Sequence, residues 1–205
     1  PARLVTRLRP RLFRVAAVLL LLGWAAAAAA DNPPRFTADP AMTRGPAGAP
    51  VTIFEWSDYQ CPFCREAQQV MGRLQAEFPD KIKITFKDFP LRSHNRAVPA
   101  AVAARCAGAQ GRYWEYHDLL FLAQPDFSRE DLLGNARRLG LDPESFAQCF
   151  DTARFQDAVL ADQREGREAG VRATPTFFIN GRKIEGALPI ETFREAVQQA
   201  LREAR

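Results

Sequence analysis

The chain has 205 residues, with 28 basic and 24 acidic side chains and a formal net charge of +4. This length suits one domain with a sizeable core. Five of the basic residues are arginines within residues 1–30, which contain no acid, so the rest of the chain is close to neutral. The excess of basic over acidic residues lies in the N-terminal segment and gives no indication of a nucleic-acid-binding surface.

The N-terminal segment has the pattern of an export signal. An arginine cluster precedes the apolar run Val15–Leu22, and the small residues Ala25–Ala30 follow. This order predicts a signal peptide over residues 1–30, with an uncleaved signal anchor as the alternative. Residues 31–48, rich in Pro, Ala and Gly, are expected to form a flexible leader. We therefore expect a periplasmic or otherwise exported protein, or one tethered to the membrane by an uncleaved segment.

The most informative stretch contains two cysteines, Cys61 and Cys64, separated by Pro62 and Phe63. The apolar run Val51–Trp56 precedes them and predicts a buried strand, and a pattern typical of a helix follows. Pro62 suits the first helical position, where its missing N–H costs nothing. We therefore expect Cys61 to be solvent-exposed at a helix N-terminus. Free N–H groups and the positive end of the helix dipole would there favour the reactive thiolate.

The same spacing is also found in zinc sites and in static structural disulfides. A zinc site needs a second ligand pair, which Cys106, Cys149, His94 and His117 do not provide, so we expect no metal. Both histidines are interpreted as helix caps or core residues. A static bridge is uncommon where a strand meets a helix. The order strand, cysteine pair, helix therefore favours a redox site that needs no cofactor.

Downstream, the pattern predicts three more strands. Residues 82–87 alternate apolar and polar side chains, as in a half-exposed strand near a sheet edge. Thr176–Ile179 and Arg182–Glu185 flank the tight turn Asn180–Gly181 and predict a hairpin. A last amphipathic helix begins after the hairpin, at Pro189.

Residues 95–170 have a helical pattern throughout. The sequence therefore predicts an α/β domain over residues 49–205, ordered β-α-β and then β-β-α. The helical residues form an insert between the second and third core strands. A right-handed crossover is expected between the first two strands, which would be parallel.

Two positions in the predicted strands are unusual. Glu55 shares a strand face with Val51 and Ile53, which predicts a buried carboxyl, although an acid turned to solvent at the strand end is the alternative. Pro175 opens a central strand, where proline cannot donate to the ladder. Such a position is tolerated if the bond between Thr174 and Pro175 is cis.

The other two cysteines fall within the helical insert. Cys106 shares an apolar helix face with Val98 and Val102, and Cys149 follows Phe146 on a later helix. Both are expected to point into one core. In an oxidising compartment this favours a Cys106–Cys149 disulfide, the alternative being two separate buried thiols.

Taken together, these features resemble the thioredoxin superfamily and, within it, the periplasmic DsbA-like disulfide oxidases, from about Ala49 to the C-terminus. The resemblance rests on Glu55 six residues before Cys61, on the Cys61–Cys64 motif, on the helical insert, and on the run Thr174, Pro175 and Thr176. It implies the thioredoxin fold.

The resemblance also implies roles for particular residues. Cys61 would be the nucleophile and Cys64 the buried partner that resolves the mixed disulfide. Glu55 would assist proton transfer to and from Cys64. Thr174 and Pro175 would hold the substrate backbone.

Phe63 would also contact substrate, but it departs from the family pattern. The best-known members carry His at this position. Phe63 donates neither a hydrogen bond nor a charge to Cys61, so we expect a smaller depression of the Cys61 pKa than in the strongest oxidases.

The predicted function is oxidation of thiols in reduced or unfolded exported proteins, followed by reoxidation through a membrane redox partner. A reductase or isomerase would use the same motif in the other direction. A third hypothesis is a non-catalytic peptide-binding module of the same fold. No nucleic-acid partner is expected.

Overall fold

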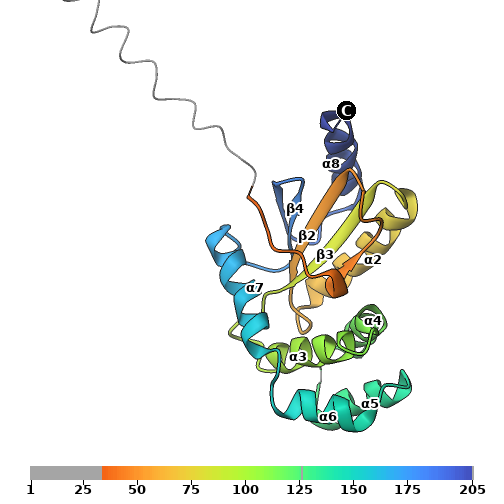
Figure 1. The fold of residues 1–205 in the computed structure, drawn as a ribbon. Coiled ribbons are helices and arrows are strands. Elements are labelled where there is room, and N and C mark those ends of the chain that lie inside the picture. Colours follow the sequence, from red (N-terminus) through yellow and green to blue (C-terminus); the bar gives the residue numbers. More distant parts are fainter. Residues whose placement is uncertain (1–33, 126, 205) are drawn as a thin grey trace, which may run out of the picture. The chain divides into compact units, whose positions relative to one another are not determined.

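The computed structural model describes residues 34–125 and 127–204, and the predicted signal segment at 1–30 lies outside them (Figure 1). Within these residues, no helix is long and apolar enough to cross a membrane. In chain order the elements are η1 (Pro40–Met42), β1 (Thr43–Arg44), β2 (Val51–Ser57), α2 (Pro62–Glu77), β3 (Ile82–Asp88), α3 (Ala97–Gly108), α4 (Tyr113–Ala123), α5 (Arg129–Arg138), α6 (Pro143–Asp151), α7 (Gln156–Glu168), β4 (Thr176–Ile179), β5 (Arg182–Glu185) and α8 (Ile190–Glu203).

The strands form one mixed sheet in the order β1-β3-β2-β4-β5. The central strand β2 runs parallel to β3 and antiparallel to β4, and β4 and β5 form the predicted hairpin. Helices α3 to α7 lie between β3 and β4 in the chain and include the lower group of helices in Figure 1. The observed order confirms the predicted α/β class and the position of its helical insert.

Successive side chains of β2 point to opposite faces of the sheet and pack into different cores. Val51 and Ile53 pack into a core made with α2 and α8. Trp56 points to the other face and packs against Phe178. There α7 comes close because it has Gly166 at the contact: a Cβ at this position would lie 2.5 Å from the Trp56 ring. The sheet is thus covered on both faces, which explains the nearly continuous apolar sequence of β2.

The edge of the sheet differs from the expectation for residues 31–48. Instead of a flexible leader throughout, η1 and β1 lie in this stretch, β1 pairs with β3, and Met42 is buried. β3 is therefore not a half-exposed edge strand. Its Thr85 is buried and shares a hydrogen bond of 2.8 Å with Thr43. A two-residue strand has no detectable period, so the sequence pattern missed it.

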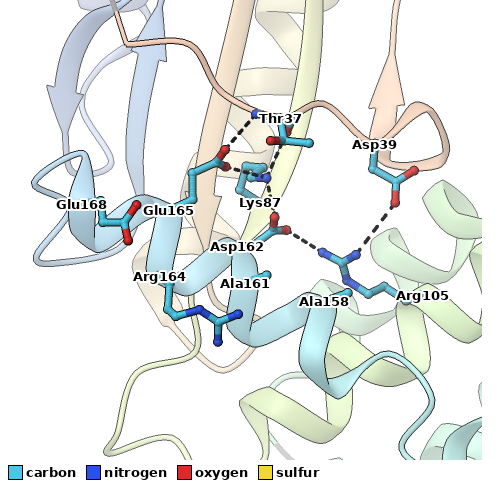
Figure 2. A pocket seen from close by; sticks show the side chains of 10 residues that line it. All are labelled: Thr37, Asp39, Lys87, Arg105, Ala158, Ala161, Asp162, Arg164, Glu165 and Glu168. Atoms are coloured by element: carbon cyan, nitrogen blue, oxygen red, sulfur yellow. Dashed lines mark hydrogen bonds and ion pairs between the residues drawn. The ribbon is translucent and has the colours of Figure 1, made fainter.

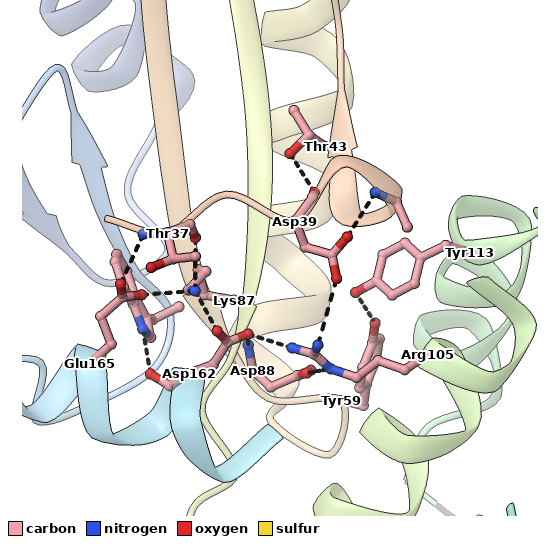
Figure 3. A network of polar contacts seen from close by, with 12 residues as sticks. Thr37, Asp39, Thr43, Tyr59, Lys87, Asp88, Arg105, Tyr113, Asp162 and Glu165 are labelled. Atoms are coloured by element: carbon pink, nitrogen blue, oxygen red, sulfur yellow. Dashed lines mark hydrogen bonds and ion pairs between the residues drawn. The ribbon is translucent and has the colours of Figure 1, made fainter. Parts of the chain in front are cut away.

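Polar residues of β3 are buried because they belong to an ion cluster (Figure 3). Lys87 pairs with Asp162 and with Glu165, the latter at 2.8 Å. Arg105 binds Asp88 at 2.6 Å and Asp162 at 2.5 Å. Burial and the neighbouring Asp88 raise the pKa of Asp162 to about 6, although both cations oppose this shift. The cluster joins β3 to α3 and α7.

The same cluster holds the segment before η1. The Lys87 ammonium donates to the Thr37 carbonyl oxygen, and the Thr37 N–H donates to Glu165. A carboxylate oxygen of Asp39 lies 3.8 Å from a guanidinium nitrogen of Arg105. Side-chain charges of β3, α3 and α7 therefore contact residues that precede the first strand.

The helical insert contains a disulfide between Cys106 of α3 and Cys149 of α6, with Cα atoms 5.9 Å apart. The two histidines occupy different environments. His117 is fully buried among aromatic rings, and burial lowers its pKa. The His94 ring lies 2.9 Å from Asp58 in the loop before Cys61.

The disulfide closes a loop of 43 residues. In the chain-entropy model such a loop stabilises the fold by about 4 kcal/mol. We expect a C106A/C149A variant to lose about this much free energy of unfolding in urea titrations. A loss under about 1 kcal/mol would contradict a structural role for the bridge.

The ion cluster leads to a pH-dependent prediction. In a Lys87→Met variant, Asp162 and Glu165 lose their shared cation, which should destabilise the fold by about 3–5 kcal/mol at pH 8. Because Lys87 opposes the raised pKa of Asp162, its removal should raise this pKa above the wild-type value of about 6. Asp162 should then be protonated in the folded variant, and the loss should shrink as the pH falls from 8 toward 6. Urea titrations at pH 8 and pH 5 measure the difference.

Lys183→Met is the matched control, because Lys183 pairs with the exposed Glu185 at the surface. We expect a loss below about 1 kcal/mol at both pH values. Equal losses for the two variants would contradict the importance of the buried cluster.

Candidate active site

Cys61 is the N-cap residue of α2, and Pro62 begins the helix. The backbone N–H groups of Cys64 and Arg65 donate to the Cys61 carbonyl oxygen. Contrary to the expected exposed thiol, only 4% of Cys61 is accessible. The Thr174 carbonyl oxygen lies 3.5 Å from its sulfur, and Gln124 binds its carbonyl oxygen at 3.1 Å. The family resemblance predicts Thr174 at this site, whereas no sequence feature indicates Gln124.

Cys61 and Cys64 are free thiols with opposite environments. A hydrogen bond from Cys64 is the main cause that lowers the pKa of Cys61 to about 6, with further help from Thr174 and from backbone N–H groups, against the effect of burial. Burial is the main cause that raises the pKa of Cys64, which is fully inaccessible. Near neutral pH the reduced pair therefore holds one thiolate, on Cys61, and one proton, on Cys64.

Glu55 of β2 is buried, with 1% of its surface accessible. Gln68 of α2 donates a hydrogen bond of 2.6 Å to its carboxyl. Burial raises the pKa of Glu55 to about 7, while Ser57, Arg44 and Gln68 oppose the shift. A carboxyl with this pKa can gain or lose a proton at neutral pH.

The Thr174–Pro175 bond is cis, and β4 begins directly after it at Thr176. Thr176 pairs with Trp56 near the end of β2, so the chain before β4 lies beside the loop that leads to Cys61. Phe63 lies at the surface with 59% of its area accessible. Of the residues predicted for the site, the structure thus brings Thr174 to Cys61, whereas Cys106 and Cys149 form their bridge in the insert.

Sequence reasoning missed the polar residues that hold the loop before Cys61. Asp58 accepts hydrogen bonds from the N–H groups of Gln60 and Leu91. Gln124, at the end of α4, donates to the carbonyl oxygens of Tyr59 and Cys61. Asp58 stands close enough to the motif to have been suspected as a turn residue. Nothing in the sequence marks Gln124, which is 63 positions from Cys61.

A polar depression has a lining that includes neither cysteine of the pair (Figure 2). Its lining includes Lys87, Arg105, Asp162 and Glu165 of the ion cluster, together with Arg164. The first four already bind one another. We therefore place the candidate active site at the cysteine pair, where the pKa values suit redox chemistry.

A family model described as Thioredoxin matches residues 37–199. Among solved structures, BdbD from Bacillus subtilis in its oxidised form is 24% identical, covers 78% of this chain and 92% of its own, and gives a TM-score of 0.72. A thioredoxin-like oxidoreductase from Silicibacter pomeroyi is 25% identical, covers 80% and 94%, and also gives 0.72. DsbA2 from Pseudomonas aeruginosa is 26% identical, covers 80% and 96%, and gives 0.65.

Curated relatives are longer. Na(+)/H(+) antiporter NhaA 1 from Salinispora arenicola is 39% identical over 158 residues, which are 77% of this chain and 24% of the antiporter. The chain thus spans about a quarter of the length of the curated relatives that it matches first.

The fold and the free cysteine pair define the class of DsbA-like thiol-disulfide oxidoreductases. The chain belongs to the thioredoxin family. The predicted family resemblance is thereby confirmed.

The asymmetry of the two thiols can be tested at Cys64. A Cys64→Ala variant removes the hydrogen bond that contributes most to the low Cys61 pKa. We expect the Cys61 pKa to rise from about 6 toward the free value of about 8.5. The pH dependence of alkylation by iodoacetamide measures this pKa. An unchanged pKa would contradict the assigned cause.

The exposed residue inside the motif offers a second test. Phe63→His places an imidazole two residues after Cys61, where the positive charge of its protonated form would stabilise the thiolate. We expect the Cys61 pKa to fall below that of the wild-type protein in the same alkylation assay. Phe63→Leu, which also lacks a charge, is the control and should leave the value unchanged.

Proposed function

We propose that the protein oxidises client thiols through a reversible Cys61–Cys64 disulfide. The observation that carries this proposal is the difference between the two thiols: the pKa of Cys61 is lowered to about 6 and that of Cys64 is raised. A stabilised thiolate on Cys61 stabilises the reduced form, so the oxidised form tends to transfer its disulfide to a client.

The proposed reaction has two exchanges. A client thiolate attacks the Cys61 sulfur, a bond forms between client and Cys61, and the Cys61–Cys64 bond breaks with its electron pair on Cys64, which takes a proton. A second client thiolate then attacks the client sulfur and releases Cys61 as a thiolate. The client has gained a disulfide, and the enzyme holds a Cys61 thiolate and a Cys64 thiol.

Other residues take supporting roles in this proposal. Thr174 and Pro175 hold the client backbone beside Cys61, and exposed Phe63 offers it an apolar contact. Glu55 exchanges a proton with Cys64. The Cys106–Cys149 bridge stabilises the insert and takes no part in exchange.

We also propose an exported location, with reduced or unfolded exported proteins as clients and a membrane redox partner as the oxidant. The pattern of residues 1–30 supports export. The Cys106–Cys149 disulfide supports it independently, because such bridges persist in oxidising compartments.

Equilibration with glutathione tests the direction of electron flow. We expect a reduction potential for the Cys61–Cys64 pair above about −200 mV, more oxidising than thioredoxin at about −270 mV. A value near that of thioredoxin would instead favour the reductase hypothesis.

A client assay tests catalysis itself. The oxidised protein should form disulfides in a reduced, unfolded test protein, and Cys61→Ser should abolish this. The C106A/C149A variant is the control and should retain it at a temperature where it is folded. Unchanged client oxidation by Cys61→Ser would favour a binding module without redox chemistry.

A further inference from the structure

A second depression of the surface, of about 390 Å³, is lined by the loop after β3 and by the end of α7 with the loop that follows it. We call it the arginine depression, because its lining includes the exposed residues Arg92, Arg167 and Arg172 and no acid. No ion pair joins any of the three to an acid within residues 34–125 and 127–204.

Other polar depressions of the described chain differ in this respect. The depression in Figure 2 contains acids of the ion cluster beside its cations. A depression over α5 combines Arg137 and Arg138 with Glu130 and Asp131. The three arginines at the end of α7 and after β3 therefore form an excess of positive charge that their own depression does not neutralise.

The rest of the lining of the arginine depression is apolar and held in place. Phe89 and Val171 are buried. The Phe89 N–H donates to the Ser57 carbonyl oxygen at 2.8 Å. The Arg172 guanidinium donates to the carbonyl oxygens of Arg167 and Val171, each at 2.9 Å. A ligand would thus meet a preformed surface and lose little free energy in ordering it.

Both segments of the lining lie close to the reactive cysteine. The Leu91 N–H donates to the Asp58 carboxylate at 2.8 Å, and the Cys61 N–H donates to the Asp58 carbonyl oxygen at 3.1 Å. Arg172 is two residues before Thr174, so their Cα atoms are at most about 7 Å apart. The Thr174 carbonyl oxygen lies 3.5 Å from the Cys61 sulfur. A client chain that reacts with Cys61 therefore reaches the arginine depression within a few residues.

We propose that the arginine depression binds an acidic side chain of the client, two to four residues from the client cysteine. The proposal rests on the oxidation proposed for Cys61 and Cys64, and it names the kind of client that is oxidised fastest. Guanidinium groups donate charge-assisted hydrogen bonds to a carboxylate, and the apolar part of the lining accepts its methylene groups.

The strength of the contact suits a client that is also held at its cysteine. An exposed pair of arginine and carboxylate contributes little by itself. Positive charge beside Cys61 nevertheless attracts an acidic client before the exchange. Once the mixed disulfide has formed, the same contact acts within one molecule, at a high effective concentration. A free anion such as phosphate would gain nothing from the disulfide or from the apolar lining.

The test compares two reduced peptides that differ only in charge. Each has two cysteines, with Glu in one peptide and Gln in the other two to four residues away on both sides. At low salt the oxidised wild-type protein should oxidise the Glu peptide about tenfold faster than the Gln peptide, per client thiolate. R92Q/R167Q/R172Q should bring this ratio near one and leave the rate with the Gln peptide unchanged. Salt at about 0.5 M should also shrink the ratio.

Two further variants separate the charge from its surroundings. R137Q/R138Q/R202Q is the matched control, because it removes the same charge from exposed arginines elsewhere on the surface. It should retain the wild-type ratio. R92K/R167K/R172K retains the charge and should show a higher ratio than the glutamine variant.

Several outcomes would overturn the subsite. Equal wild-type rates for the two peptides, or a wild-type ratio in R92Q/R167Q/R172Q, would do so and leave client oxidation standing. An equal slowing of both peptides by this variant would show a structural role instead. A wild-type dimer that the variant loses in sedimentation would show that a second copy of the chain occupies the depression. A wild-type protein that oxidises neither peptide would contradict the proposed oxidation and the subsite together.

Discussion

The fold depends on a buried charge cluster that the sheet and the helical insert share. A buried lysine or arginine without a partner is strongly destabilising. Lys87 of the core strand β3 finds its partners on α7, and Arg105 of α3 finds one on β3 and one on α7. Neither the sheet nor the helical insert can provide all the partners of these charges alone. The insert is therefore an integral part of the domain, and its docking fixes the chain on both sides of the cysteine pair.

At the cysteine pair, the deciding property is the difference between the pKa values of two neighbouring thiols. Cys61 and Cys64 belong to the same helix turn, yet their surroundings assign the negative charge to one sulfur and the proton to the other. The difference arises mainly from the hydrogen bond of Cys64 to Cys61, which lowers the Cys61 pKa, and from the burial of Cys64, which raises its own. The strand beneath adds an acid that titrates near neutral pH, Glu55.

Sequence reasoning predicted those parts of the fold that have a local period or a strong motif. The four longer strands, the helical insert and the helix that begins after Cys61 belong to this group. It did not predict β1, which is too short to have a period. It also missed the burial of Lys87, because a lysine on an alternating strand is normally exposed and its acidic partners come from α7. The approach of Gln124 to Cys61 was missed for the same reason, since Gln124 comes from a distant segment, whereas Thr174 was expected at the site from the family resemblance.

The disulfide of the insert has a topological consequence. The bond between Cys106 and Cys149 encloses α4 and α5 in a covalent ring, while β2 lies before the ring and β4 after it. A single cut by a protease within the ring would leave both fragments attached through the two sulfurs. The strand that leads to Cys61 and the strand that follows Pro175 would then remain one molecule until that bond is reduced. The bridge thus makes a nicked chain separable only under reducing conditions.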